Sequence, residues 1–94
     1  MTAEINLDTH FSVPPQVMSR LVGEETVLLD IANGVYFGLD GVGKRIWENI
    51  ADGLSLQETA AVITTEFEVE DTRAQDDVVA FARNLVDREL LRTL

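Results

Sequence analysis

The hydrophobic positions in the first half of the chain fall into three short runs separated by polar turn residues, and each run predicts a β-strand. The runs span residues 17–22, 26–32 and 35–39. Gly23 and the two glutamates after it predict a turn between the first two strands. Asn33-Gly34 predicts a type I′ turn between the second and third, because that turn needs positive φ at both central residues. The pattern therefore predicts a three-stranded antiparallel meander.

After Asp40 the hydrophobic period changes from two to about 3.6 residues, which predicts three amphipathic helices. Asp40 is the expected N-cap of the first helix. Ser55 and Glu58 have the spacing of a capping box and begin the second. Asp71 is the expected N-cap of the third helix, which should end near Arg88. The predicted fold class is α+β: a three-stranded antiparallel β-meander followed by three α-helices, an arrangement like a winged helix.

Residues 1–16 precede the first strand and end near Pro14-Pro15, which disfavours both helix and sheet pairing. We expect a flexible N-terminal arm over residues 1–16 and one folded domain over residues 17–94. His10, the only histidine, is expected to be a solvated residue of this arm. The start has no basic region followed by an apolar one, and no apolar run approaches the roughly 20 residues that span a bilayer. The sequence thus predicts a cytoplasmic protein with no membrane segment.

Charge and composition argue against several functions. Seven Lys and Arg against seventeen Asp and Glu give a net charge of −10, which opposes binding to a phosphate backbone. A small winged-helix DNA-binding or regulatory module nevertheless stays open as the alternative function. The segment 38–45 has P-loop spacing, but Arg45 occupies the position that requires Ser or Thr. With no cysteine and no assembled nucleophile and base, we predict that the chain is not an enzyme and uses no metal or cofactor.

The outer strands of the predicted meander leave unpaired N–H and C=O groups at the sheet edges. The run 35–39 is short and apolar and has no Lys or Pro, so an extended peptide can add to it as a further strand. Alternatively, the N-terminal arm covers this edge and leaves no place for a peptide. Pairing with a second copy is a further alternative, so the chain is predicted to be a monomer or a strand-paired or swapped dimer. On the third helix, Val79 lies beside the face of Val78 and Leu85, where it either widens the core or lines a groove.

The segment from Thr26 to Gly53, with VLLD, NGVYFGLD and RIWENIADG in this order, resembles the PqqD-like family. The resemblance covers residues 17–91. It implies a recognition element for precursors of ribosomally synthesised, post-translationally modified peptides. In such a domain the leader peptide adds as a strand to the third β-strand and lies against the third helix. The domain then presents the precursor to a modifying enzyme, such as a radical-SAM protein or a lasso-peptide protease and cyclase.

The resemblance also implies two groups of peptide-binding residues. The strand group is Val35, Tyr36, Phe37, Gly38 and Leu39, and the helix group is Asp76, Val79 and Arg83. Because neighbouring strand residues alternate, Tyr36 and Phe37 should face opposite sides of the sheet. The chain departs from the family at Arg88-Glu89, where Gly is frequent. It also has Ala32-Asn33-Gly34 where members of the pyrroloquinoline quinone pathway have a Pro-Glu-Gly type turn. This difference favours a general leader-binding member over a true pyrroloquinoline quinone factor, and both a lasso-type and a PQQ-like pathway stay open.

Overall fold

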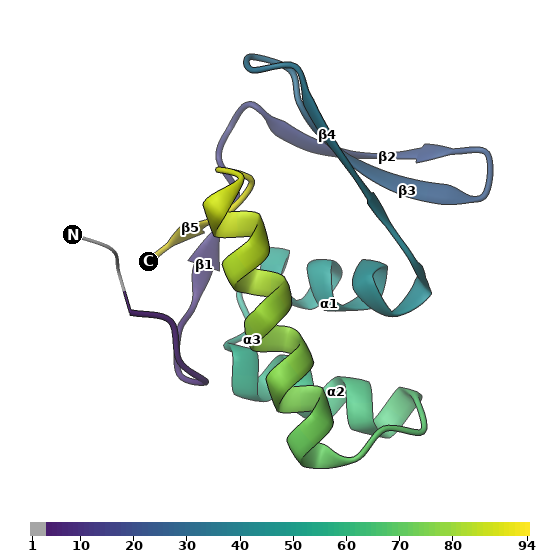
Figure 1. Cartoon of the computed structure of the whole chain (residues 1–94), viewed down its shortest axis with the longest axis vertical. Helices are drawn as coiled ribbons and strands as arrows, with labels where there is room; N and C mark the ends of the chain where they lie inside the picture. The colour runs from purple at the N-terminus through teal and green to yellow at the C-terminus, as the bar shows by residue number, and fades with distance from the viewer. Residues whose placement is uncertain (1–3) are drawn as a thin grey trace.

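The computed structural model describes residues 4–94 and confirms the predicted α+β fold. An antiparallel sheet with the strand order β2-β3-β4 is followed by three helices (Figure 1). The elements are β1 (Phe11–Ser12), β2 (Val17–Val22), β3 (Glu25–Asp30), β4 (Val35–Leu39), α1 (Gly41–Ala51), α2 (Leu56–Glu66), α3 (Asp71–Asp87) and β5 (Arg92–Thr93).

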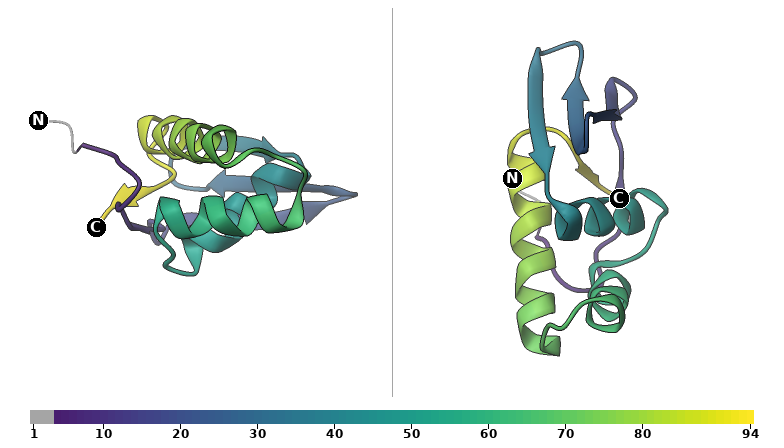
Figure 2. Two further views of the ribbon diagram at one scale, coloured as in Figure 1. Left: turned by 90° about the horizontal axis from the view of Figure 1, so that it is seen from below. Right: turned by 90° about the vertical axis from the view of Figure 1, so that its right-hand side faces the viewer.

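The sheet and the helices form two layers, which Figure 2 shows from two further sides. Apolar side chains from both layers meet in one core, in which Leu28 of β3, Ile50 of α1 and Leu85 of α3 are fully buried. Trp47 of α1 is also buried in this core. The hairpin of β2 and β3 extends beyond the helices, whereas β4 leads directly into α1 (Figure 1). The core therefore fixes β4 relative to α1.

Two of the three predicted helix caps are confirmed. The Asp40 carboxylate accepts a hydrogen bond from the Gly43 amide at 2.7 Å. Ser55 and Glu58 form the reciprocal capping box, with distances of 3.1 and 2.9 Å. The predicted cap at Asp71 is wrong by one residue, because Asp71 already belongs to α3 and Glu70 occupies the N-cap without a side-chain hydrogen bond. Asp71 instead places negative charge in the first turn, where the helix dipole favours it.

The predicted type I′ turn between β3 and β4 is wrong. β3 ends at Asp30, which pairs with Val35, so four residues form the loop. Within the loop only Gly34 has a positive φ, of 67°. The physical reason is the buried Asp30 carboxylate, which accepts from the Asn33 amide at 3.1 Å and from Asn33 Nδ2 at 2.8 Å. The Gly34 amide also donates to the Asp30 carbonyl at 2.9 Å, closing a wider turn than a two-residue hairpin allows.

Residues 4–16, which the sequence predicts to belong to a flexible arm, contribute side chains to the core. Phe11 is only 3% exposed and pairs with Thr93, so β1 and β5 form a separate two-stranded sheet. Ile5 is buried in the same core. His10 is exposed, as expected, and its Nδ1 lies 2.8 Å from the Gly53 carbonyl oxygen. Burial of two large apolar side chains outweighs the effect of the prolines, since the prolines only limit pairing close to themselves.

Candidate functional site

β4 is the edge strand of the main sheet and carries the candidate site. It pairs with β3 through the register Thr26–Leu39 to Asp30–Val35, and no other strand among residues 4–94 pairs with its outer side. The N-terminal segment does not cover this edge by strand pairing, because β1 pairs with β5 in a different sheet. The backbone groups on the outer side of β4 are therefore available to an added strand.

The side chains of β4 alternate between the two faces of the sheet, as predicted for Tyr36 and Phe37. Tyr36 is 72% exposed on the face away from the helices, and Gly38 is exposed on the same face. Phe37 is half-buried, packed against the hydrophobic core, and Leu39 is buried there. An added strand would thus extend both an apolar inner face and an open outer face.

Two side chains lie toward β4, one from α3 and one from its C-cap residue. A methyl group at Gly43 would lie 3.4 Å from Phe81 Cε2 and 3.7 Å from Leu39 Cδ2, so Phe81 packs where β4 passes into α1. The Arg88 guanidinium lies 5.1 Å from the centre of the Phe37 ring. Figures 1 and 2 show β4 and α3 on the same side of the molecule. We call Phe37, Phe81 and Arg88 the β4–α3 junction.

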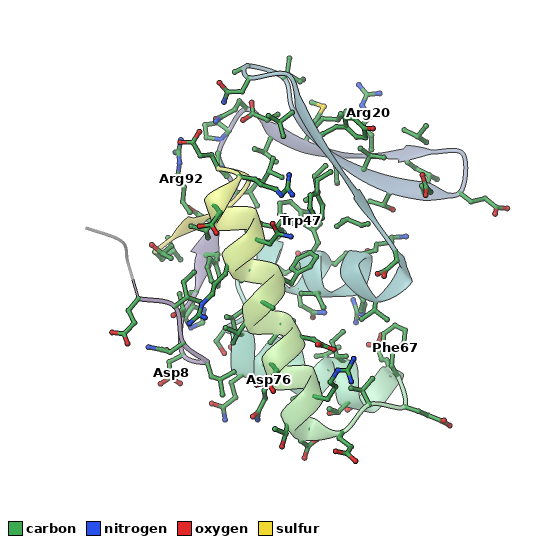
Figure 3. The ribbon with its side chains drawn as sticks, in the orientation of Figure 1. Asp8, Arg20, Trp47, Phe67, Asp76 and Arg92 are labelled. Carbon is green, nitrogen blue, oxygen red and sulfur yellow. The ribbon has the colours of Figure 1, made fainter. Side chains whose placement is uncertain are left out.

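The helix residues expected from the family resemblance lie elsewhere on α3. Asp76 and Arg83 are exposed, and Val79 is half-buried against the core. Because each helical residue turns by about 100°, Val79 points roughly 200° away from Phe81 and lies on the opposite flank. Figure 3 shows Asp76 on the half of α3 that lies beside α2. The structure therefore brings Phe37 to Arg88 and Leu39 close to Phe81, but does not bring Asp76 or Val79 to this junction.

Sequence reasoning missed two residues of the junction for different reasons. Phe81 shares the helical period of Val78 and Leu85, and this period is typical of a core position. Arg88 carried a usable signal, because it stands near a position where the resembling family often has Gly. The predicted end of the helix near Arg88 is confirmed, but the contact of Arg88 with Phe37 depends on how α3 packs against β4, which the hydrophobic pattern does not give.

Asp30 anchors the start of β4, and its pKa is lowered from 3.8. The largest cause is the hydrogen bond from the Asn33 side chain, which stabilises the charged form. Burial works in the opposite direction, while the amides of Asn33 and Ala32 and the Gln16 side chain lower the pKa further. The ionised carboxylate thus holds the loop that positions the edge strand.

We expect Asp30→Asn to make the free energy of unfolding depend less on pH at acidic pH. A lowered folded-state pKa means that the stabilisation is complete above the unfolded value of 3.8 and is lost as the pH falls through the folded value. Urea unfolding midpoints between about pH 2 and 6 should therefore fall less steeply in the variant. Some slope should remain, because the pKa values of Glu58 and Glu66 are also lowered, by Ser55 and Arg45. Identical slopes in both proteins would contradict the role of Asp30.

The rest of the described chain offers little alternative chemistry. Residues 4–94 contain no group of three or more His, Cys, Asp or Glu side chains that could hold a metal ion. No helix in this range is long and apolar enough to cross a membrane. A hollow at the start of α3 is lined by Glu68, Glu70 and the ion pair of Arg73 with Asp77. It lies at the opposite end of α3 from Arg88 and has no apolar edge strand beside it.

A domain with three helices after a small antiparallel sheet belongs to the α+β class of folds. Within this class the chain belongs to the PqqD family. The family model described as coenzyme PQQ synthesis protein D matches residues 25–91. The match begins with β3 and includes β4 and all three helices.

Two solved structures resemble the chain over most of its length. TbiB1 in complex with the TbiA(beta) leader peptide is 36% identical, with a TM-score of 0.78, and the match covers 85% of this chain and 93% of that one. Lasso peptide synthetase B1 complexed with the leader peptide is 29% identical, with a TM-score of 0.80 and coverage of 90% and 98%. No curated protein matches the sequence.

Proposed function

We propose that the chain is a non-catalytic adaptor that binds the leader peptide of a ribosomally synthesised, post-translationally modified peptide precursor. The leader adds as a strand to the free edge of β4, and the domain presents the precursor to a modifying enzyme. The observation that carries this proposal is the open edge of β4 beside α3, in a fold shared with two solved leader-peptide complexes. Main-chain hydrogen bonds supply affinity in this mode of binding, and side-chain contacts supply specificity.

The proposed binding residues follow from the two faces of β4. Residues 35–39 pair with the leader, and inward-facing leader side chains lie near Phe37 and Phe81. Asp76, Val79 and Arg83 stay predictions of the family resemblance. The half-burial of Val79 favours its role in the core over a role in a groove.

The partner enzyme is proposed to be a lasso-type protease and cyclase rather than a radical-SAM protein. The support is the lasso peptide synthetase B1 among the solved relatives. We also propose that the protein binds the leader as a monomer, because a dimer paired through β4 would occupy the edge to which the leader adds.

A titration of the ¹⁵N-labelled protein tests the function directly. The ligand is a synthetic leader peptide from the precursor gene encoded beside this one, with a scrambled leader as the control. We expect amide shifts concentrated on Val35–Leu39, with every second amide of β4 exchanging more slowly in the complex. Alternate protection is the signature of strand addition, since only every second residue directs its backbone groups to the outer edge.

Other outcomes would contradict the proposal in different ways. Shifts confined to Asp76, Val79 and Arg83 would move the site to the exposed side of α3 and overturn strand addition. Absence of binding by any leader encoded nearby would overturn the adaptor function. A gel shift of generic duplex DNA at low salt would instead support the DNA-binding alternative.

A further inference from the structure

Arg88 is held in place although it has no carboxylate partner. The ion pairs among residues 4–94 join Arg45 to Glu48 and Glu66, and Arg73 to Asp77. Arg88 Nε instead donates to Asn84 Oδ1 at 3.0 Å, and its guanidinium lies over Phe37. Both contacts restrict the side chain before any ligand is bound, which reduces the entropy that binding has to remove.

Helix α3 ends in a cap directly after Arg88. Glu89 has a φ of 61°, in the left-handed region, and the Leu90 amide donates to the Leu85 carbonyl at 2.8 Å. This geometry ends the helix as a C-terminal cap and redirects the chain after Arg88. In a protein with a net charge of −10, Arg88 forms no internal ion pair within the described residues.

The position of Arg88 links its charge to the edge strand. Its guanidinium contacts the ring of Phe37, which belongs to the middle of β4. Arg88 Nε donates its hydrogen bond to Asn84 Oδ1, while no described residue accepts a hydrogen bond from the two terminal nitrogens of the Arg88 guanidinium. Two parallel N–H groups of a guanidinium match the two oxygens of a carboxylate, so a strand added to β4 meets a fixed site for an acidic side chain.

We propose that Arg88 is a specificity residue that binds an aspartate or glutamate side chain of the leader peptide. The inference rests on the proposed function, because the carboxylate arrives on the strand added to β4. The inference goes beyond the proposed function in two ways. It predicts that one position of the leader is an acidic residue, and it assigns Arg88 of this chain to the recognition of that residue.

A double-mutant cycle tests this assignment. Calorimetric titrations use the leader encoded beside the gene, and variants in which each Asp is changed to Asn and each Glu to Gln, one at a time. They are measured against the wild-type protein, Arg88→Gln and Arg88→Lys. One leader substitution should weaken binding to the wild-type protein by roughly three- to tenfold and have almost no effect on binding to Arg88→Gln. Arg88→Lys should recover only part of the affinity, because lysine lacks the planar fork.

Arg92→Gln is the matched control, because it removes an exposed arginine of β5 outside the β4–α3 junction. It should leave the preference for the carboxylate unchanged. A purely structural Arg88 would weaken the binding of every leader variant by the same factor, and this result would overturn the inference. So would a leader whose carboxylates all prove dispensable. Either result leaves the adaptor function intact, whereas failure of the wild-type protein to bind any leader removes the adaptor function itself.

Discussion

Replacing Phe11 with alanine is expected to lower the free energy of unfolding by about 3–5 kcal/mol. Phe11 is only 3% exposed and belongs to the main hydrophobic core, although it lies in a two-residue strand near the start of the chain. Its removal takes a large apolar side chain out of the core and leaves a cavity that the surrounding side chains fill only in part. Urea unfolding followed by the fluorescence of the buried Trp47 measures the change.

Tyr36→Ala is the matched control for this prediction. It removes an aromatic side chain of similar size that is 72% exposed, so its effect on stability should be small. If Phe11→Ala proved as harmless as Tyr36→Ala, residues 4–16 would behave as the flexible arm that the prolines predict. Should Phe11→Ala fail to fold, Phe11→Leu keeps part of the apolar contact and allows a smaller loss to be measured.

Replacing Phe37 with alanine is expected to weaken leader binding by roughly ten- to a hundredfold. The substitution removes the apolar side chain that β4 presents at the junction, and burial of a side chain of this size contributes about 1.5–3 kcal/mol. It also removes the ring over which the Arg88 guanidinium lies. Calorimetric titration with the leader measures the loss, and thermal unfolding checks that the variant is folded.

The same Tyr36→Ala variant distinguishes the two faces of β4. Tyr36 neighbours Phe37 but points away from the helices, so its removal should change leader affinity by less than about threefold. If Tyr36→Ala lost binding while Phe37→Ala bound normally, the leader side chains that determine affinity would contact the face of the sheet that points away from the helices. That result would contradict the β4–α3 junction as the source of specificity.

The elements with strong local signals were predictable from the sequence. β2 and β4 have the predicted bounds, because turn residues flank each apolar run. Asp40 and Ser55 form the predicted caps, since a side chain that bonds an amide three residues ahead is a local interaction. The free edge of β4 follows from the meander itself and needs no knowledge of side-chain packing.

The features that depend on distant parts of the chain were not predictable in the same way. The place of Phe11 depends on β5, which is only two residues long and has no periodicity of its own. The loop after Asp30 depends on a buried carboxylate, whereas Asn-Gly by itself predicts a tighter turn. The contact of Arg88 with Phe37 depends on how the end of α3 packs against β4, which lies far from it in the chain. Local propensity gives none of these three outcomes.

The pairing of Phe11 with Thr93 has a consequence for the order in which the molecule folds. It closes a loop of roughly 80 residues, and the entropy cost of loop closure rises with loop length. The hairpins β2–β3 and β3–β4 join neighbouring segments and can form early. We therefore expect the pairing of β1 with β5 to form last and to open first, so that thermal fraying begins at this second sheet while the edge that receives the peptide stays intact.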